Sequence, residues 1–292
     1  MEGLRGGGGR LVSTNGGGIR LSGERDIPRL IELTAAEGWR LGERDFSRLM
    51  ALWPKGLYVY EEGKRVVGMV TVSTYGRTAW IGNLVVERGS RGRGIGSALM
   101  ERALSDLDSL GIRSTLLYSV KGVEGFYGRF GFSIVDSYVV YSGIVRATRR
   151  RPRASPMSVR DLPGVVGVDV YAFGDDRSAL LERILGEFPQ TSLVHRSLGS
   201  VVGYVMATES NNTFTIGPAA YLAPGADEVL IESIATLLDG RRCFLTAPSV
   251  QRGDVMASVG LERVAEVTMM VRGPPPPSHP ECLLAAASLG KG

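Results

Sequence analysis

The sequence predicts an α/β protein with two domains, each a twisted, mostly antiparallel mixed sheet flanked by helices (an α+β arrangement). Two observations predict this. Short β-branched segments alternate with segments of helical apolar spacing along the chain. The strand-like segment Val66–Val70 also recurs 135 residues later, at Val201–Val205, as a weak internal repeat. A chain of 292 residues is long enough to form two such domains.

The first half shows the expected elements in a clear order. Ile19–Leu21 predicts a strand, and Asp26 with Pro28 in the first turn predicts a helix that ends near Gly38. A second helix is expected from Asp45. The later elements are strands at 57–60, 65–75 and 78–86, a helix from about 95 to 110, a strand at 114–119, a helix at 122–130 and a strand at 133–141.

The most informative stretch runs from Asn83 to Met100. Its apolar start predicts a buried strand, and the helical spacing after it begins at Leu99. Between them lie four glycines and three arginines. Glycines directly before a helix leave its first N–H groups bare, and the helix dipole adds positive potential. The stretch therefore predicts an anion site for a phosphate-bearing ligand.

Two common phosphate loops do not fit this stretch. A P-loop needs Lys-Ser or Lys-Thr after its last glycine, and none is present. A dinucleotide loop needs Gly-x-Gly-x-x-Gly, whereas Gly92, Gly94 and Gly96 are spaced by two. A tight surface turn without a ligand remains the plain alternative for the loop taken alone.

Arg91–Gly96 instead reads Arg-x-x-Gly-x-Gly, which is similar to the pyrophosphate loop of the GNAT superfamily of acyl-CoA-dependent N-acyltransferases. A second GNAT motif, Tyr-x-x-x-Gly-Phe, matches the stretch that begins at Tyr127 and ends at Phe132. The order of the expected elements over residues 19–143 also resembles the GNAT fold. Two separate motifs in the expected order leave little room for the ligand-free turn.

The resemblance implies a cofactor, acetyl-CoA, as the acyl donor, and it assigns residues to each task. Tyr127 matches the acid that protonates the leaving thiolate; simple packing against CoA is its alternative role. The cofactor-binding positions are a strand end for the pantetheine arm and a loop for the pyrophosphate, namely Leu84, Val85, Val86, Arg91, Gly92, Arg93, Gly94, Ile95, Gly96 and Ser97. No general base can be assigned, because Thr78–Asn83 contains no carboxylate and Glu87 lies towards the loop.

The acceptor is expected to be a primary amine, of a small molecule or of a protein, lying across the splayed strands. The candidate acceptor contacts are Trp39, Asp45, Trp53 and Tyr75, of which Asp45 carries the charge that would pair with a cationic amine. The two tryptophans also fit ordinary core positions. Transfer of a longer acyl group, and a non-catalytic acyl-CoA or metabolite sensor, remain alternative functions.

The second half repeats the strands but not the loop. Trp80-Ile81-Gly82 has its counterpart at Thr215-Ile216-Gly217, and then Tyr221–Glu228 replaces the arginine–glycine run. Asp227 and Glu228 would satisfy the free N–H groups of the helix and repel phosphate. Met256 stands where Tyr127 does in the first half. The second half, with Ala172–Arg177 near its start, thus resembles the degenerate C-terminal domain of a YitH-like tandem-GNAT family.

The composition of the chain limits its expected cellular location and its expected binding partners. The chain is 43% hydrophobic and 22% charged, and it has a net charge of +4. Without an apolar run of about 18–20 residues or a signal-peptide core, we expect a cytoplasmic protein with no membrane contact. Its arginines suit a polyanionic cofactor, so we expect no nucleic-acid partner. Two cysteines and two histidines lie in no ligand motif, and we expect no metal.

Composition also suggests the domain boundaries. The expected segments are a disordered glycine-rich tail at 1–18, a catalytic domain at 19–145, a basic linker at 146–156, a degenerate domain at 157–273, and a proline-rich segment with a tail at 274–292. In the last segment, Pro274–Pro277 predicts an extended spacer, and Cys282–Leu289 predicts a short apolar helix that docks on the body.

Overall fold

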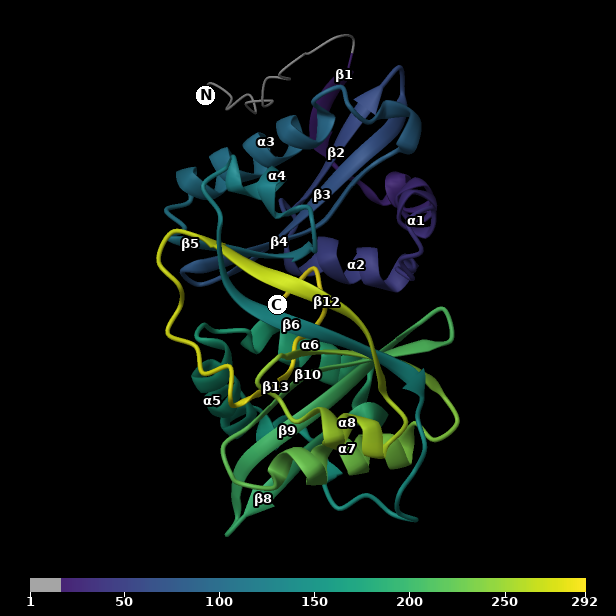
Figure 1. The fold of residues 1–292 in the computed structure, drawn as a ribbon, viewed down its shortest axis with the longest axis vertical. Helices are drawn as coiled ribbons and strands as arrows, with labels where there is room; N and C mark the ends of the chain where they lie inside the picture. The colour runs from purple at the N-terminus through teal and green to yellow at the C-terminus, as the bar shows by residue number, and fades with distance from the viewer. Residues whose placement is uncertain (1–16) are drawn as a thin grey trace, which may run out of the picture.

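A single mixed sheet runs through the whole molecule and joins its two halves (Figure 1). The computed structural model describes residues 17–292. Of the predicted disordered tail at 1–18, all but Gly17 and Gly18 therefore lies outside the described residues, and these two begin the first strand.

The first half follows the predicted order of elements. Its strands are β1 (Gly17–Leu21), β2 (Leu57–Glu62), β3 (Arg65–Tyr75), β4 (Thr78–Val86), β5 (Ser114–Val120) and β6 (Ser133–Ile144). Its helices are α1 (Ile27–Ala35), α2 (Glu43–Leu52), α3 (Ile95–Ser109) and α4 (Glu124–Gly128), with short 3-10 turns at Glu24–Asp26 and Arg88–Ser90. The predicted bounds of β3 and β4 agree with the structure.

The second half repeats this order. Its strands are β7 (Ser155–Pro156), β8 (Ser192–Ser197), β9 (Ser200–Ser210), β10 (Thr213–Tyr221), β11 (Arg242–Pro248), β12 (Glu262–Arg272) and β13 (Leu283–Ala285). Its helices are α5 (Leu162–Phe173), α6 (Ser178–Glu187), α7 (Ala226–Leu237) and α8 (Gly253–Ser258), with 3-10 turns at Val159–Asp161 and Pro189–Thr191. Strands β9 and β10 have the same lengths as β3 and β4, as the internal repeat predicts.

The two halves exchange their last long strands. The strand order across the centre of the sheet is β4-β5-β12-β6-β11-β10. Strand β12 of the second half therefore lies between β5 and β6 of the first, and β6 lies between β12 and β11 of the second. Each half thus completes the sheet of the other, an arrangement that the sequence analysis does not foresee.

Apolar side chains fix which helices cover which face. Helix α3 packs on β2–β5 through residues such as Leu99 and Leu107, and Phe126 and Tyr127 of α4 pack on the edge of that core. Helices α1 and α2 cover the opposite face through residues such as Leu30 and Phe46. A third core joins the halves, because it packs Tyr75 and Trp80 against α5 and α6.

The predicted helix at Cys282–Leu289 is wrong, although the segment does dock on the body. Residues Leu283–Ala285 form β13, which pairs antiparallel with β10, and residues 283–287 are buried. The alanine-rich run has good helix propensity, but pairing with free backbone groups of the sheet outweighs that weak preference.

Candidate active site

Strands β4 and β5 pair only at their first residues and then separate. The parallel pairing ends with Ile81 opposite Leu117, and residues 82–86 of β4 pair only with β3. A bulge accompanies the separation: Asn83 and Leu84 of β4 lie opposite the single residue Val70 of β3, and Asn83 adopts a positive φ of 49°. The opening leaves a strand edge that does not pair with β5 and includes the predicted pantetheine positions Leu84, Val85 and Val86; the Val86 carbonyl accepts a hydrogen bond from Arg91 Nε at 2.9 Å.

The N-terminus of α3 lies at the end of this opening and is bare. Gly92 and Gly94 have φ of 76° and 82°, a left-handed conformation that favours glycine. The Ala98 N–H donates to the Gly94 carbonyl at 2.9 Å, and among residues 17–292 no side chain caps the helix. A Cβ added at Gly92 or Gly94 would meet nothing within 4 Å. Among the described residues, this turn therefore presents free N–H groups to an approaching anion, as the pyrophosphate of CoA requires.

The arginines of the loop are held by glutamates at its rim. Arg91 donates to Glu37 Oε1 at 2.6 Å, and Arg93 makes two hydrogen bonds to Glu62, the shorter of 2.8 Å. Both arginine side chains remain about half exposed. They can therefore exchange these surface carboxylates for phosphate oxygens, since exposed ion pairs contribute little stability.

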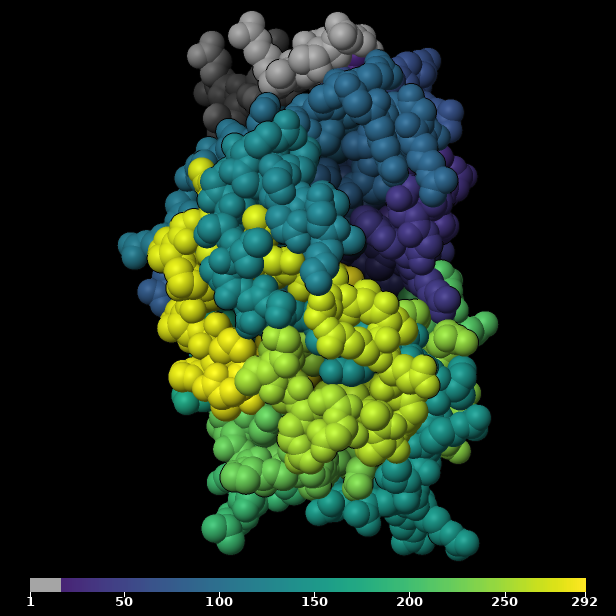
Figure 2. All heavy atoms as spheres, viewed as in Figure 1, coloured from purple at the N-terminus to yellow at the C-terminus, as the bar shows by residue number. Residues whose placement is uncertain are grey.

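Tyr127 lies near the predicted cofactor positions. Its ring belongs to the same apolar cluster as Leu84 and Val86, and the neighbouring Phe126 packs against the first turn of α3 at Gly96. Burial raises the pKa of Tyr127 to about 12. The phenol therefore keeps its proton at neutral pH, as a proton donor must. In the space-filling view, the surface is hollowed between the teal residues around α4 and the purple residues of α1 (Figure 2).

The carboxylate of Glu87 is hydrogen-bonded to two arginine side chains. Its Oε1 accepts hydrogen bonds from Arg29 at 2.7 Å and from Arg65 at 2.5 Å. These contacts tie the loop end of β4 to Arg29 of α1 and Arg65 of β3. Glu87 is thus an element of structure, and the general base remains unassigned.

The candidate acceptor-binding residues differ in their exposure and in the contacts that they already make. Trp39 is 36% exposed, beyond the end of α1. Asp45 accepts from the Gly42 N–H at 2.9 Å and pairs with Arg48, so it caps α2. Trp53 packs edge-on against Tyr75 and donates to the Thr74 carbonyl at 3.0 Å. Asp45 and the two aromatic residues therefore already have structural partners.

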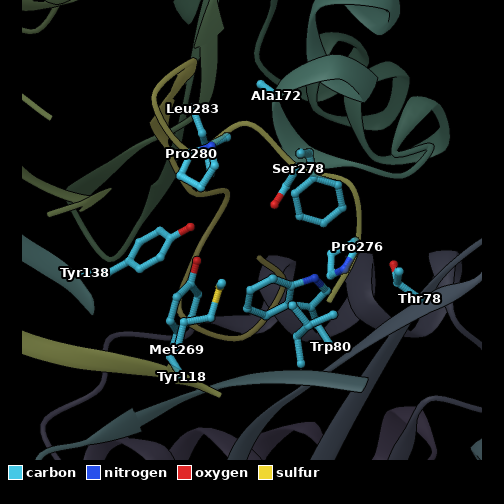
Figure 3. A pocket seen from close by; sticks show the side chains of 12 residues that line it. Thr78, Trp80, Tyr118, Tyr138, Ala172, Met269, Pro276, Ser278, Pro280 and Leu283 are labelled. Atoms are coloured by element: carbon cyan, nitrogen blue, oxygen red, sulfur yellow. The ribbon is translucent and has the colours of Figure 1, made fainter. Parts of the chain in front are cut away.

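Trp80 and Asn83 are two residues at the opening that the sequence analysis did not select. Trp80 stacks near Tyr118 and Phe173, and with Tyr138 and Met269 it lines a small cavity of about 20 Å³ (Figure 3). Asn83 donates to Thr71 Oγ1 at 3.1 Å. The only signal in the sequence was position: both flank the bulge of β4.

In the second half, helix α7 begins with the same backbone geometry as α3, but its first turn carries acidic residues. Gly225 before α7 has a φ of 75°, close to that of Gly94. The first turn of α7 carries Asp227 and Glu228, and Arg252 pairs with Glu228 at 2.7 Å. Among residues 17–292 no hydrogen bond joins either carboxylate to an N–H of this turn, so the expectation that they satisfy these groups is wrong, but their negative charge still opposes an anion there.

The matching strand opening is also filled. Strand β10 pairs with β11 only at residues 214–216, and it bulges beyond them as β4 does. Strand β13 occupies the gap: Ala285 lies opposite Ala219 of β10, and the Ala286 N–H donates to the Thr246 carbonyl of β11 at 2.8 Å. The second half therefore lacks the free strand edge of the first, and the first turn of its helix is acidic.

Comparison with known proteins agrees with this division. Residues 28–132 match the acetyltransferase (GNAT) family, and residues 165–285 match an acetyltransferase (GNAT) domain. The uncharacterized N-acetyltransferase YitH of Bacillus subtilis (strain 168) is 24% identical over 225 residues, which are 75% of this chain and 77% of YitH. The two matched regions follow one another and together cover most of the chain.

Solved structures show the same fold. A candidate acetyltransferase from Pyrococcus horikoshii superposes with a TM-score of 0.82 at 20% identity, covering 99% of this chain and 100% of that one. A GCN5-related N-acetyltransferase from Sphaerobacter thermophilus superposes with a TM-score of 0.70 at 13% identity, over 91% and 99%. Within residues 17–292, none of the helices has the length and apolar character needed to span a bilayer.

Proposed function

The chain belongs to the GNAT superfamily as a tandem acyltransferase, and from this membership we propose that its first domain transfers an acetyl group from acetyl-CoA to a primary amine. The observation that carries the proposal is the combination, in the first half only, of an open β4–β5 edge with an α3 N-terminus whose first turn has no acidic residue. In the second half β13 fills the edge and Asp227 and Glu228 stand in the first turn of α7, which supports a single active site.

In this proposal the pyrophosphate lies on the N–H groups of the first turn of α3. The glycines permit close approach, the helix dipole attracts the charge, and Arg91 and Arg93 flank the loop. The pantetheine amides extend along residues Leu84–Val86, which do not pair with β5. A backbone N–H at this edge would donate to the thioester carbonyl and stabilise the oxyanion of the transition state.

The amine would attack the thioester carbon directly, within a ternary complex of enzyme and both substrates. The C–N bond forms, the C–S bond breaks, and the leaving thiolate takes a proton from the phenol of Tyr127. The proton lost by the amine passes to a base that the site does not identify, or the amine enters already neutral. With a pKa raised to about 12 by burial, the Tyr127 phenol is protonated at neutral pH, as the proposed acid role requires.

The acceptor is proposed to enter from the face of β4 that lies opposite α3 and α4. Helix α2, with Asp45, Trp53 and the adjoining Tyr75, walls this face, and Trp39 lies farther out. The acceptor would be a small molecule or a protein amine. The second domain, whose own cofactor site is closed, would then contribute to this wall.

A thiol-release assay with acetyl-CoA and a panel of primary amines tests the proposal. We expect steady release of CoA that depends on one or more of the amines. Saturable binding of acetyl-CoA without release would indicate a sensor instead. Cys243 and Cys282 are the two thiols of the chain, and the pKa of each is raised by burial, that of Cys243 to about 12, so they add little signal of their own.

A further inference from the structure

Residues 286–292 of this chain lie on the face of β4 from which the acceptor is proposed to enter. A Cβ added to Gly82 would come within 2.4 Å of the Gly290 Cα, and one added to Gly292 would come within 2.4 Å of the Trp80 ring. In Figure 1 the end marked C accordingly lies in the middle of the molecule, near β12 and β6. The segment thus covers the strand at the position where it separates from β5.

Polar contacts hold the segment in a defined conformation. The Tyr75 hydroxyl donates to the Lys291 carbonyl at 2.8 Å, and the Arg177 guanidinium donates to the Gly292 carbonyl at 2.9 Å. The Ala287 N–H donates to the same Gly292 carbonyl at 2.6 Å, which closes residues 287–292 into a compact turn. These contacts make the segment an ordered part of the fold.

The side chain of Lys291 is costly in this place. The residue is only 9% exposed, and among residues 17–292 no carboxylate lies within 4.0 Å of its ammonium. Asp45 and Glu187 attract the charge from a greater distance, Arg48 repels it, and burial lowers the pKa of Lys291 to about 8. A buried cation without a close partner weakens docking rather than strengthening it.

The attachment of the segment also permits release. Strand β13 is fixed independently by β10 and β11, so movement of residues 288–292 does not require β13 to leave the sheet. Glycines stand on both sides of Lys291, and glycine gives a chain freedom to change direction. Leu289 is 41% exposed and contributes little to docking.

We infer that residues 288–292 are an internal occupant of the acceptor site, which the acceptor must displace. The hydrogen bonds of Tyr75 to the Lys291 carbonyl and of Arg177 to the Gly292 carbonyl hold this occupant in place until then. The inference rests on the proposed function, since it places the acceptor on this face. The segment lowers the apparent affinity for the acceptor, because only the fraction of molecules whose site is open can bind it.

Two variants of the full chain should shift the equilibrium between the docked and the released segment in opposite directions. In Gly290→Val the added Cβ would lie 3.0 Å from Asn83 Nδ2, and the two methyl groups would extend farther, so the segment is pushed out. Lys291→Met keeps an apolar arm but removes the buried charge, so the segment docks more tightly. Leu289→Ala is the matched control, because that side chain is turned partly to solvent.

Calorimetric titration with Nα-acetyl-lysine amide, without acetyl-CoA, measures the effect directly. We expect a Kd about tenfold lower for Gly290→Val and about tenfold higher for Lys291→Met than for the unaltered chain and Leu289→Ala. Equal Kd values in all four proteins would overturn the occupancy.

These outcomes remain separate from the proposed transfer reaction. If the Kd shifts occur but no amine releases CoA, the occupancy holds and the proposed function fails. Thermal melting checks that each variant is folded. Should Gly290→Val fail that check, the sign of the shift in Lys291→Met still decides the question.

Discussion

The backbone of Ile81 pairs with that of Leu117, and beyond this pair β4 and β5 separate towards the first turn of α3. In the proposed function, the separation would give acetyl-CoA a strand edge for its pantetheine arm and a helix N-terminus for its pyrophosphate. Because the two features adjoin, binding should depend strongly on the charge of that first turn.

Ser97→Glu should abolish most of this binding without harming the fold. It places a carboxylate in the first turn of α3, as Glu228 does in α7. We expect the Kd of acetyl-CoA to rise at least tenfold, since the carboxylate competes for the free N–H groups and repels phosphate. The melting temperature should stay the same or rise, because an acid at a helix start contributes about 0.3–1 kcal/mol.

Ser97→Gln is the control for Ser97→Glu, because it adds similar bulk without charge. Calorimetry and thermal melting of the two variants give the comparison. If Ser97→Glu binds acetyl-CoA as tightly as Ser97→Gln does, the pyrophosphate does not lie on this turn.

Tyr127→Phe tests the proposed acid. Removing the phenolic proton should lower kcat by about 10²–10⁴-fold, the usual contribution of a general acid, while the Kd of acetyl-CoA changes less than about twofold, since the ring still packs against Phe126 and Phe132. Tyr171→Phe on α5, a half-exposed tyrosine that stacks on His279, should leave kcat unchanged. Unchanged turnover in Tyr127→Phe would remove the acid from the mechanism.

The pH dependence of turnover should show no loss from ionisation of Tyr127 over the ordinary alkaline range. The phenol acts in its protonated form, and its pKa of about 12 lies well above that of a free tyrosine. We therefore measure kcat at saturating amine from pH 7 to 10 in the unaltered chain and in Tyr127→Phe. We expect no fall of kcat at high pH that is present in the unaltered chain and absent from the variant. A limb near pH 10 that disappears in this variant would mean that the phenol is not buried during turnover.

The ion pair between Arg177 and Asp169 should be a large contributor to stability. Both side chains are fully buried, Arg177 NH2 lies 2.6 Å from Asp169 Oδ1, and the Tyr204 hydroxyl also donates to this carboxylate. Asp169→Asn leaves a buried cation without its charge partner, so we expect a loss of about 3–5 kcal/mol in the free energy of unfolding.

The exposed pair of Lys121 and Glu266 provides the comparison for Asp169→Asn. Lys121→Met should cost less than about 1 kcal/mol, because solvent screens that pair. Urea unfolding of both variants measures the difference. If Asp169→Asn loses less free energy of unfolding than Lys121→Met does, the buried network does not stabilise the fold.

Residues 1–156 should not fold by themselves. Removing the second half takes β12 away from β5, where it pairs along residues 115–120, and it leaves β6 without both of its neighbours. Unpaired central strands expose backbone groups and apolar surface that favour aggregation. We expect this fragment to be aggregated or unfolded by circular dichroism and gel filtration; a monomer with a cooperative melting transition would contradict the strand exchange.

Much of the first half could be predicted because its signals are local. Alternating β-branched residues around the turns give the bounds of β3 and β4, and the glycine run with its following helical spacing gives α3. The candidate site followed from short motifs at Arg91–Gly96 and Tyr127, which the fold brings to one opening. The internal repeat also identified the strands that correspond in the second half.

The remainder depends on contacts between residues far apart in the chain. Nothing local in β6 or β12 indicates that each pairs within the sheet of the other half. The alanines near 285 favour a helix, yet the free edge of β10 is available and they form a strand there. Asp45 was selected for its charge, but its carboxylate caps α2, and the position of Lys291 near it depends on the whole fold.

The most direct test of the central claim is to identify the product by mass spectrometry after incubating the protein with acetyl-CoA and the amine panel. The account predicts an amine that carries one acetyl group on its nitrogen, formed in equal amount to free CoA, and far less of both with Tyr127→Phe. Binding of acetyl-CoA without any acetylated amine, or equal product from Tyr127→Phe, would contradict it.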